Sequence, residues 1–317
     1  MKFTRLLCAA DFHGSNAVFG KFVSACLAHQ ADGGFIAGDL TGKAVVPLIH
    51  KGNNVYEGYL FNNKRVATTQ LELAKTMDDI ASVGFYPVEM EPDEASHLSN
   101  DKDAMSDLFR RVMLERLYSW MEIAEKRLKP VGIPLYIIPG NDDDPYIDQA
   151  LAGQEGVFNP DGRKFVFKDE YEVIGMAEAN MTPWHCPRDV SEEVLQEKIT
   201  RMVGMLERPE TSIWLIHDAP HNSLLDECPV LDSELRIVAS AGQVLMQAVG
   251  STSVRKSIEQ YQPLLTIHGH VHESPGARKI GRTLSVNPGS EYAEGILRAL
   301  IINVEPKKVR GHMPISA

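Results

Sequence analysis

Cysteine is scarce in this sequence, and the four residues present lie far apart. No two of them are separated by only two residues, which is the spacing of thiolate zinc sites and redox-active motifs. The pattern argues against a disulfide framework and a cysteine-based zinc site, and it predicts reduced, mostly buried thiols. The four residues are Cys8, Cys26, Cys186 and Cys228.

Long hydrophobic runs are also missing. No apolar stretch reaches the roughly 18 residues of a membrane-spanning helix. The first residues, "MKFTRLLCAADFHG", pass from a short apolar stretch straight into polar residues, without the length or cleavage site of a signal peptide. We therefore expect no membrane association and a cytoplasmic location.

Positive charge is in deficit. The chain has 32 Lys and Arg against 43 Asp and Glu, a formal net charge of −11. Binding to a long nucleic acid requires clustered basic residues, so no such partner is expected. A small anionic substrate remains compatible with this charge, because bound cations reverse the local charge of a site. Hydrophobic residues make up 44% of the chain, enough for a sizeable core.

Short apolar segments alternate with helical patterns along most of the chain. This alternation indicates an α/β fold whose sheets are covered on both faces. Ser15 or Asn16 is a suitable N-cap for the first helix. The predicted helices cover 15–30 and 250–261, a hairpin covers 164–178, and the predicted strands cover 3–11, 33–39, 133–142, 212–220, 263–273, 282–290 and 296–305.

Residues 42–131 interrupt this alternation, because they are far longer than an ordinary connection between strands. We expect a helical insertion with helices around 65–83 and 104–129, joined by an acidic, proline-containing loop. The insertion is either a surface elaboration, a lid over the functional site or a dimer contact.

Metal-ligand residue types follow the end of each of five predicted strands. In open α/β sheets, ligands bind at the carboxyl ends of strands, and residues two apart in extended chain point the same way. Taken singly, each of these residues is more typical of a turn, a helix cap or a buried histidine. Five such signals in order predict one metal site. The residues are Asp11, His13, Asp39, Asn141, Asp142, His217, His270 and His272.

These motifs resemble the pattern of the calcineurin-like metallophosphoesterases: "DFH" at 11–13, "GD" at 38–39, "GND" at 140–142, a single histidine at 217 and "GHVH" at 269–272. The segment "VNPGSEY" at 286–292 is also similar to a family signature. The resemblance implies a four-layer αββα sandwich in which helices flank two mixed sheets. We expect one domain over 1–317 that carries the 42–131 insertion.

The resemblance also implies two divalent metal ions. Asp11, His13 and His272 would hold the first ion, and Asn141, His217 and His270 the second, with Asp39 bridging both. Mixed nitrogen and oxygen ligands suit Mn, Fe, Zn or Ni better than Ca. Two such ions bind the phosphate oxygens of a substrate and lower the pKa of a bridging water, which then attacks phosphorus as hydroxide.

The sequence departs from the family pattern at Asp142, where many members have a histidine that protonates the leaving group. A carboxylate beside two cations is a poor proton donor, although it can orient His217 or a water molecule. His221 is the candidate replacement acid; alternatively it is a surface loop residue. Since members that lack the histidine favour phosphodiesters, we expect a small or cyclic phosphodiester as substrate.

Several residues and functions remain open at this level. Arg255 and Lys256 are either phosphate contacts or ordinary helix surface charges, whereas Trp184 and His185 are candidates for stacking on a ring. His268 is expected to pack inside its strand. Phosphomonoesterase or protein phosphatase activity is the alternative function, and an inactive protein-binding scaffold is less compatible with a full set of ligands. A homodimer is possible.

Overall fold

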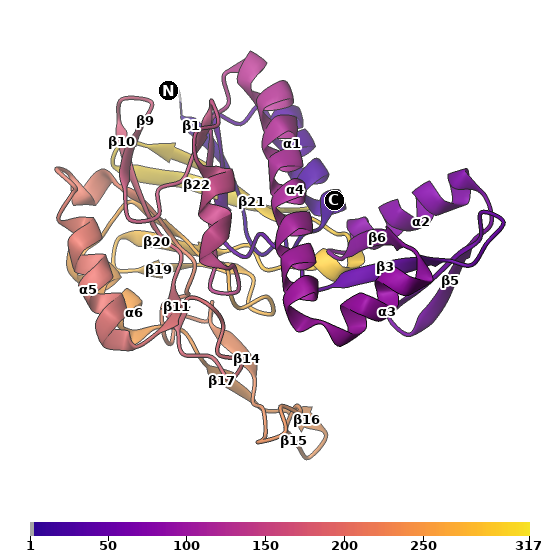
Figure 1. Ribbon diagram of the computed structural model, residues 1–317. Helices are drawn as coiled ribbons and strands as arrows, with labels where there is room; N and C mark the ends of the chain where they lie inside the picture. Colours follow the sequence, from indigo (N-terminus) through magenta and orange to yellow (C-terminus); the bar gives the residue numbers. More distant parts are fainter. Residues whose placement is uncertain (1–2) are drawn as a thin grey trace.

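Two six-stranded mixed β-sheets pack face to face at the centre of the protein, in a computed structural model that describes residues 3–317 (Figure 1). The first sheet has the order β22 (Lys308–Ser316), β21 (Arg298–Glu305), β1 (Thr4–Ala9), β2 (Gly33–Ala37), β7 (Leu135–Ile138) and β8 (Val157–Phe158). The second has the order β19 (Gly276–Ile280), β20 (Thr283–Asn287), β18 (Leu265–Ile267), β13 (Ile213–Ile216), β10 (Tyr171–Met176) and β9 (Lys164–Phe167).

The central strands of each sheet are parallel, and every strand added at an edge is antiparallel to its neighbour except β8, which runs parallel to β7. In the first sheet β1, β2 and β7 run parallel, and in the second sheet β10, β13, β18 and β20 do. The predicted hairpin at 164–178 is confirmed as β9 and β10. All seven predicted strands are present, and the prediction of mixed sheets is confirmed.

Alternate residues of each central strand enter different cores, because successive side chains of a strand point to opposite faces. In β1, Leu7 packs toward the helices, whereas Leu6 and Cys8 pack between the two sheets. In β13, Leu215 packs between the sheets and Trp214 packs toward the outer helices. Every residue of β1 from Leu6 onward is therefore buried.

Helices cover the outer face of both sheets and complete the expected four layers. On the first sheet lie α1 (Asn16–Ala28) and α4 (Lys102–Leu128), and on the second lie α5 (Glu192–Val203) and α6 (Thr252–Tyr261). The Ser15 side chain accepts a hydrogen bond from the Val18 amide, which confirms it as the N-cap of α1. Solved structures with the same arrangement are described below.

The segment 42–131 contains the two predicted helices but is not purely helical. Besides α2 (Gln70–Ser82) and α4, it has α3 (Pro92–Asn100) and a four-stranded sheet. That sheet has the order β5 (Asn63–Ala67), β4 (Tyr56–Leu60), β3 (Val45–His50) and β6 (Tyr86–Met90). Because α4 packs on the first main sheet, it belongs to the sandwich, and only the preceding residues project beside it (Figure 1).

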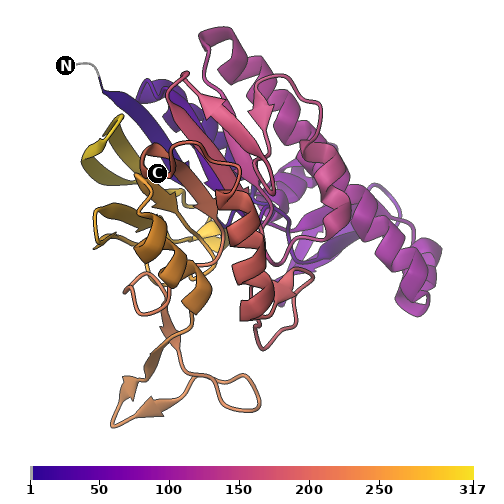
Figure 2. The ribbon, with the colours of Figure 1, turned by 90° about the vertical axis from the view of Figure 1, so that its left-hand side faces the viewer.

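A long two-stranded arm projects from another part of the protein, at the bottom of Figures 1 and 2. It consists of β14 (Glu227–Pro229) paired with β17 (Met246–Ala248), and of β15 (Ala239–Ser240) paired with β16 (Gln243–Val244). We refer to residues 227–249 as the arm. A further short pair is β11 (Ala179–Asn180) and β12 (Asp189–Val190).

Short 3-10 helices complete the secondary structure: η1 (Lys129–Val131), η2 (Pro145–Leu151), η3 (Pro209–Thr211) and η4 (Tyr292–Glu294). Within residues 3–317, no helix combines the length and the apolar character that crossing a bilayer requires.

Candidate metal centre

Polar side chains from both main sheets meet at one edge of the sandwich. They follow the carboxyl ends of β1, β2 and β7 in the first sheet, and of β13 and β18 in the second. Parallel strands end at a common edge, so the loops that follow them converge. The structure brings together the seven residues that the sequence analysis selected as ligands: Asp11, His13, Asp39, Asn141, His217, His270 and His272.

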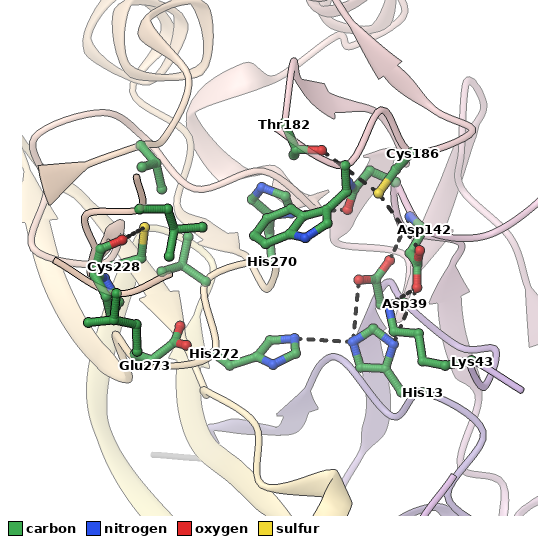
Figure 3. Close-up of a pocket in the computed structure, with 17 residues that line it drawn as sticks. His13, Asp39, Lys43, Asp142, Thr182, Cys186, Cys228, His270, His272 and Glu273 are labelled. Carbon is green, nitrogen blue, oxygen red and sulfur yellow. Dashed lines mark hydrogen bonds and ion pairs between the residues drawn. The ribbon is translucent and has the colours of Figure 1, made fainter. Parts of the chain in front are cut away.

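One group of four side chains surrounds a common point. Asp11, His13, Asp39 and His272 each offer a ligand atom, and these atoms lie within 4.8 Å of one another. The Nε2 atoms of His13 and His272 are 3.1 Å apart, and Nε2 of His13 is 3.5 Å from Oδ2 of Asp39. Figure 3 shows these three side chains directed at one another. The group can hold a metal ion.

A second group shares Asp39 with the first. Oδ1 of Asn141 lies 3.0 Å from Nε2 of His217 and 3.0 Å from Nδ1 of His270. Nε2 of His217 is 3.4 Å from Oδ1 of Asp39. The two oxygens of Asp39 therefore face different groups, which is the position that a bridging carboxylate needs.

Neighbouring hydrogen bonds fix which atoms face the second group. Nδ1 of His217 donates to the Ala37 carbonyl at 2.7 Å, so Nε2 carries the free lone pair. The Asn141 amide donates through Nδ2 to Asp189 at 2.8 Å, so its oxygen points inward. Acceptor atoms thus crowd together. Such a cluster needs either a proton or a cation among its members, and the donor set fits a divalent ion.

The first group contains buried polar atoms that no described residue satisfies. Oδ2 of Asp11 and Nδ1 of His13 have no hydrogen-bond partner within the described chain. An unsatisfied buried polar atom costs about 1–3 kcal/mol, and more when it is charged. Burial also raises the pKa of Asp11, because desolvation disfavours the ionised carboxylate. A cation bound beside Asp11 would relieve the cost at this carboxylate, whereas Nδ1 of His13 faces Oδ2 of Asp142 at 3.7 Å.

Burial keeps two of the imidazoles neutral, as metal ligation requires. It lowers the pKa of His13 well below its ordinary value and that of His270 to about 3. Burial also disfavours charge on Asp39 and His217, but the attraction between the two charged groups outweighs this cost. It holds the pKa of Asp39 well below its usual range and raises that of His217 to about 10. Without an ion, a proton on His217 therefore balances Asp39.

The backbone is strained at this edge. Asp11, His13, Asp39 and His270 adopt positive φ angles of 56°, 42°, 49° and 68°. L-residues rarely occupy this left-handed region, and such strain persists only where the surrounding fold enforces it. Gly269 permits the close approach of two strands, since a Cβ there would lie 2.7 Å from Oδ2 of Asp11.

A cavity of about 620 Å³ opens over both groups. This volume lies within the usual range for small-molecule sites, about 300–1,000 Å³. Its lining residues are His13, Asp39, Lys43, Asn141, Asp142, Thr182, Trp184, Cys186, Cys228, Pro229, Leu231, Ile237, Val249, His270, Val271, His272 and Glu273.

Lys43 and Asp189 are site residues that the sequence analysis missed. Lys43 pairs with Asp142 at the wall of the cavity (Figure 3). Burial opposes the charge on Lys43, but the pair with Asp142 raises the pKa of its ammonium group. Asp142 also donates its amide to Oδ1 of Asp39 at 3.1 Å. Neither Lys43 nor Asp189 belongs to a motif, so the sequence carries no signal for them.

The structure separates the other predicted site residues. Trp184 lines the cavity, and His185 does not. His221 is also outside the lining, and its Nδ1 lies 3.7 Å from Oδ2 of Asp226, so its role as the replacement acid stays a prediction. Arg255 donates to the carbonyls of His221 and Asn222 and to Glu259, which agrees with a surface role.

Two residues behind this edge, one of them buried, have structural positions. His268 is fully buried, with Nδ1 near the carbonyls of Ile216 and Asp218 and Nε2 near Thr266, as a packed strand residue should be. Ser290, at the end of the "NPGS" segment, donates to the Asp11 carbonyl at 2.6 Å.

Comparison with known proteins gives one curated relative and several similar folds. No family model matches the chain. The uncharacterized protein MJ1162 of Methanocaldococcus jannaschii is 29% identical over 153 residues, which are 48% of this chain. The match spans only 62% of the length of that relative.

Among solved structures, TT1561 of Thermus thermophilus superimposes with a TM-score of 0.54 at 14% identity, and the match covers 99% of both chains. YfcE, a phosphoesterase from E. coli, gives a TM-score of 0.33 at 11% identity over 98% of each chain. The likeness to TT1561 shows that the layered α/β sandwich is a known fold.

Proposed function

We propose that this chain is a phosphoesterase of the calcineurin-like metallophosphoesterase type, which uses two divalent ions to hydrolyse phosphodiesters. The proposal depends on one observation: seven ligand-type side chains from five strand ends meet around Asp39 in two groups. The unpartnered Oδ2 of Asp11 supports it further, because a cation would satisfy this atom.

The chain supplies two sets of ligands. Asp11, His13 and His272 form the first set; Asn141, His217 and His270 form the second; Asp39 belongs to both. When bound, two such ions neutralise phosphate oxygens and make a water molecule nucleophilic at neutral pH. The identity of the ions is open among Mn, Fe, Zn and Ni.

The protein itself orients these ligands and shields them from solvent. The Ala37 carbonyl holds His217 in one tautomer, and Asp189 holds the Asn141 amide in one orientation. Both His217 and Asp11 are fully buried, so the ligand geometry is set before any ion or substrate arrives.

The charge of the cavity wall supports a diester. Lys43 is the sole lysine or arginine among the described residues that line the cavity, and Asp142 already pairs with it. A phosphate monoester carries close to two negative charges at neutral pH, and beyond the two metal ions its second charge would find no free side-chain cation in the cavity wall. A diester carries only one. The Lys43–Asp142 pair therefore favours the diester.

The test combines metal analysis with a substrate comparison. Protein purified without chelators should contain up to two transition-metal ions per chain, measured by elemental analysis. With Mn²⁺ added, it should hydrolyse an aryl phosphodiester faster than the matching monoester. Asp39→Asn should lower both metal content and turnover by more than about 100-fold, since ligand loss exceeds the 10–100-fold effect of a supporting residue.

Asp101→Asn is the matched control, because this aspartate also accepts backbone amides but lies outside the cavity lining. It should keep full activity. Full turnover in Asp39→Asn would refute the assignment of the metal ligands. A strong monoester preference would refute the diester alone.

A further inference from the structure

We infer that the arm and Trp184 form an apolar subsite that binds a ring-bearing, uncharged ester group of the phosphodiester. This inference deepens the proposed function, since the phosphate end of the substrate rests on that proposal. It concerns the part of the cavity that lies away from the candidate metal ligands.

The cavity has two chemically different sides. The candidate ligands, Lys43 and Asp142 form one side. The arm forms another, through Pro229, Leu231 and Ile237. In Figure 3, the arm residue Cys228 lies across the cavity from Asp142 and Lys43. A phosphate bound at the candidate metal centre would therefore direct one of its ester groups toward the apolar side chains of the arm.

Hydrogen bonds hold the arm against the sandwich at its base. The Asp226 carboxylate accepts the amides of Asn222 and Ser223 on one side and of Gly250 on the other. Ser274 accepts the Glu227 amide at 2.9 Å and donates to the Glu227 carbonyl at 2.7 Å. The apolar wall is thus anchored to the main fold at both ends of the arm.

The arm also fixes its own apolar residues. Leu231 and Ile237 form an antiparallel β-bridge between the two segments of the arm, so they lie side by side. The Val230 amide donates to the Leu245 carbonyl at 2.8 Å, and the Val238 amide donates to the Val230 carbonyl at 2.8 Å. These backbone hydrogen bonds hold the side chains of Leu231 and Ile237 next to each other, so together they form one continuous apolar surface at the cavity.

Trp184 supplies an aromatic face beside this surface. It lines the cavity and is 61% exposed, so its ring is accessible to a ligand bound there. Its loop is not loose, because Asp189 accepts the amides of Thr182 and Cys186. Asp189 is the residue that also orients Asn141. Asp189 therefore fixes the position of the Trp184 loop relative to the candidate metal centre.

These features select an uncharged ring as the occupant. A flat ring can stack on Trp184 while its edge contacts aliphatic side chains such as Ile237. A second phosphate would instead meet the Glu273 carboxylate and no free cation, because Lys43 is already paired. A ring-bearing ester fits the cavity better than a simple alkyl or a second charged group does.

Tryptophan fluorescence tests the subsite without relying on turnover. The chain has three tryptophans, and Trp120 and Trp214 are buried at 1% and 0% exposure, so acrylamide quenching reports mainly on Trp184. The probes are diphenyl phosphate and dimethyl phosphate, added to Mn²⁺-loaded protein. Diphenyl phosphate should protect Trp184 from quenching, and dimethyl phosphate should not. A Trp184→Phe variant should lose the quenchable fluorescence, which shows that the signal comes from Trp184.

A matched pair of arm variants locates the effect. Ile237→Ser removes a cavity-lining side chain, and Val244→Ser removes a similarly exposed side chain of the arm outside the lining. Ile237→Ser should weaken diphenyl phosphate binding about fivefold, in line with the loss of a few methylene-sized contacts. Val244→Ser should leave it unchanged. Equal effects of the two variants would overturn the inference.

Kinetics provide the second measurement. Methyl p-nitrophenyl phosphate and phenyl p-nitrophenyl phosphate share a leaving group and differ only in the remaining ester. The phenyl substrate should have a KM about tenfold lower, and Trp184→Ala should remove that difference. Trp184→Phe should restore part of it.

The outcomes separate the two proposals. Hydrolysis of both substrates with equal KM, together with no protection of Trp184, would overturn the subsite and leave the phosphoesterase standing. Protection of Trp184 by diphenyl phosphate, sensitive to Ile237→Ser but without hydrolysis in the presence of any tested metal, would support the subsite and overturn the phosphoesterase.

Discussion

Asp189 holds a candidate metal ligand in place, and replacing it should weaken one metal site more than the other. Its Oδ1 accepts Nδ2 of Asn141 at 2.8 Å. Its Oδ2 accepts the amides of Thr182 and Cys186 at 3.0 and 2.9 Å and the Thr182 hydroxyl at 2.5 Å. All four bonds require an acceptor. In Asp189→Asn, one of the two acceptor atoms becomes a donor.

The expected size of the effect follows from this mismatch. If the new carboxamide keeps its oxygen toward Thr182 and Cys186, its NH₂ group faces Nδ2 of Asn141. The Asn141 amide must then turn and present nitrogen, which has no free lone pair, to His217 and His270. Losing the support of one ligand costs about 10–100-fold in metal affinity, or about 1.4–2.7 kcal/mol.

Calorimetric titration of metal-free protein with Mn²⁺ measures this effect. The isotherm of the unchanged protein should show two sites. In Asp189→Asn, the site that includes Asn141 should weaken by the stated factor, whereas the site that includes Asp11 and His272 should change little. Asp101→Asn serves again as control. An unaltered two-site isotherm in Asp189→Asn would contradict the role given to this carboxylate.

Three further perturbations follow from the structure. Gly269→Ala should lower activity and thermal stability, because its Cβ would lie 2.7 Å from Oδ2 of Asp11; activity equal to that of the unchanged protein would exclude this close packing. Burial raises the pKa of Asp161 to about 6 from an ordinary 3.8, so the folded state binds a proton more tightly than the unfolded state does. The protein should therefore lose stability relative to Asp161→Asn as pH rises from 4 to 7, by at most about 3 kcal/mol in urea unfolding, and a constant difference would refute the shift. Chelation with EDTA should lower the unfolding temperature, because Mn²⁺ at about 1,000 times its Kd adds about 4 kcal/mol of stability; a calorimetric scan insensitive to Mn²⁺ would argue against a site in the folded chain.

The candidate ligands could be selected from the sequence because they follow strand ends in short, recognisable motifs. Asp39 directly follows the "IAG" end of a buried strand, and His217 follows "IWLI". In parallel sheets such positions converge whatever the intervening chain does. Their convergence is what the structure shows; their assignment as ligands stays a prediction.

The sheet within 42–131 left no comparable pattern. Strand β5 is exposed at four of its five residues, and β4 carries a glycine at Gly58. Pro47 lies inside β3, which argues against a strand when only the sequence is read. It is tolerated because the pairing of β3 with β4 covers only Ile49 and His50. The four-stranded sheet within 42–131 is therefore determined by pairing between distant strands and not by local β-propensity.

The sequence analysis did not predict Lys43, Asp189 or the arm for a related reason. Asp189 pairs with Asn141 across 48 residues, and Lys43 pairs with Asp142 across 99. Single charged residues in loops carry no spacing that identifies a partner. The arm's apolar residues read as ordinary connecting chain until the bridge between Leu231 and Ile237 is known.

The left-handed backbone at Asp11, His13, Asp39 and His270 ties activity to the integrity of the whole sandwich. Each of these residues would relax to an ordinary conformation if its neighbours loosened, so this edge stores free energy that the rest of the molecule must hold back. Warming should release this edge ahead of the cores beneath it. Metal binding would then be lost while the sheets are still folded, and cooling would restore it.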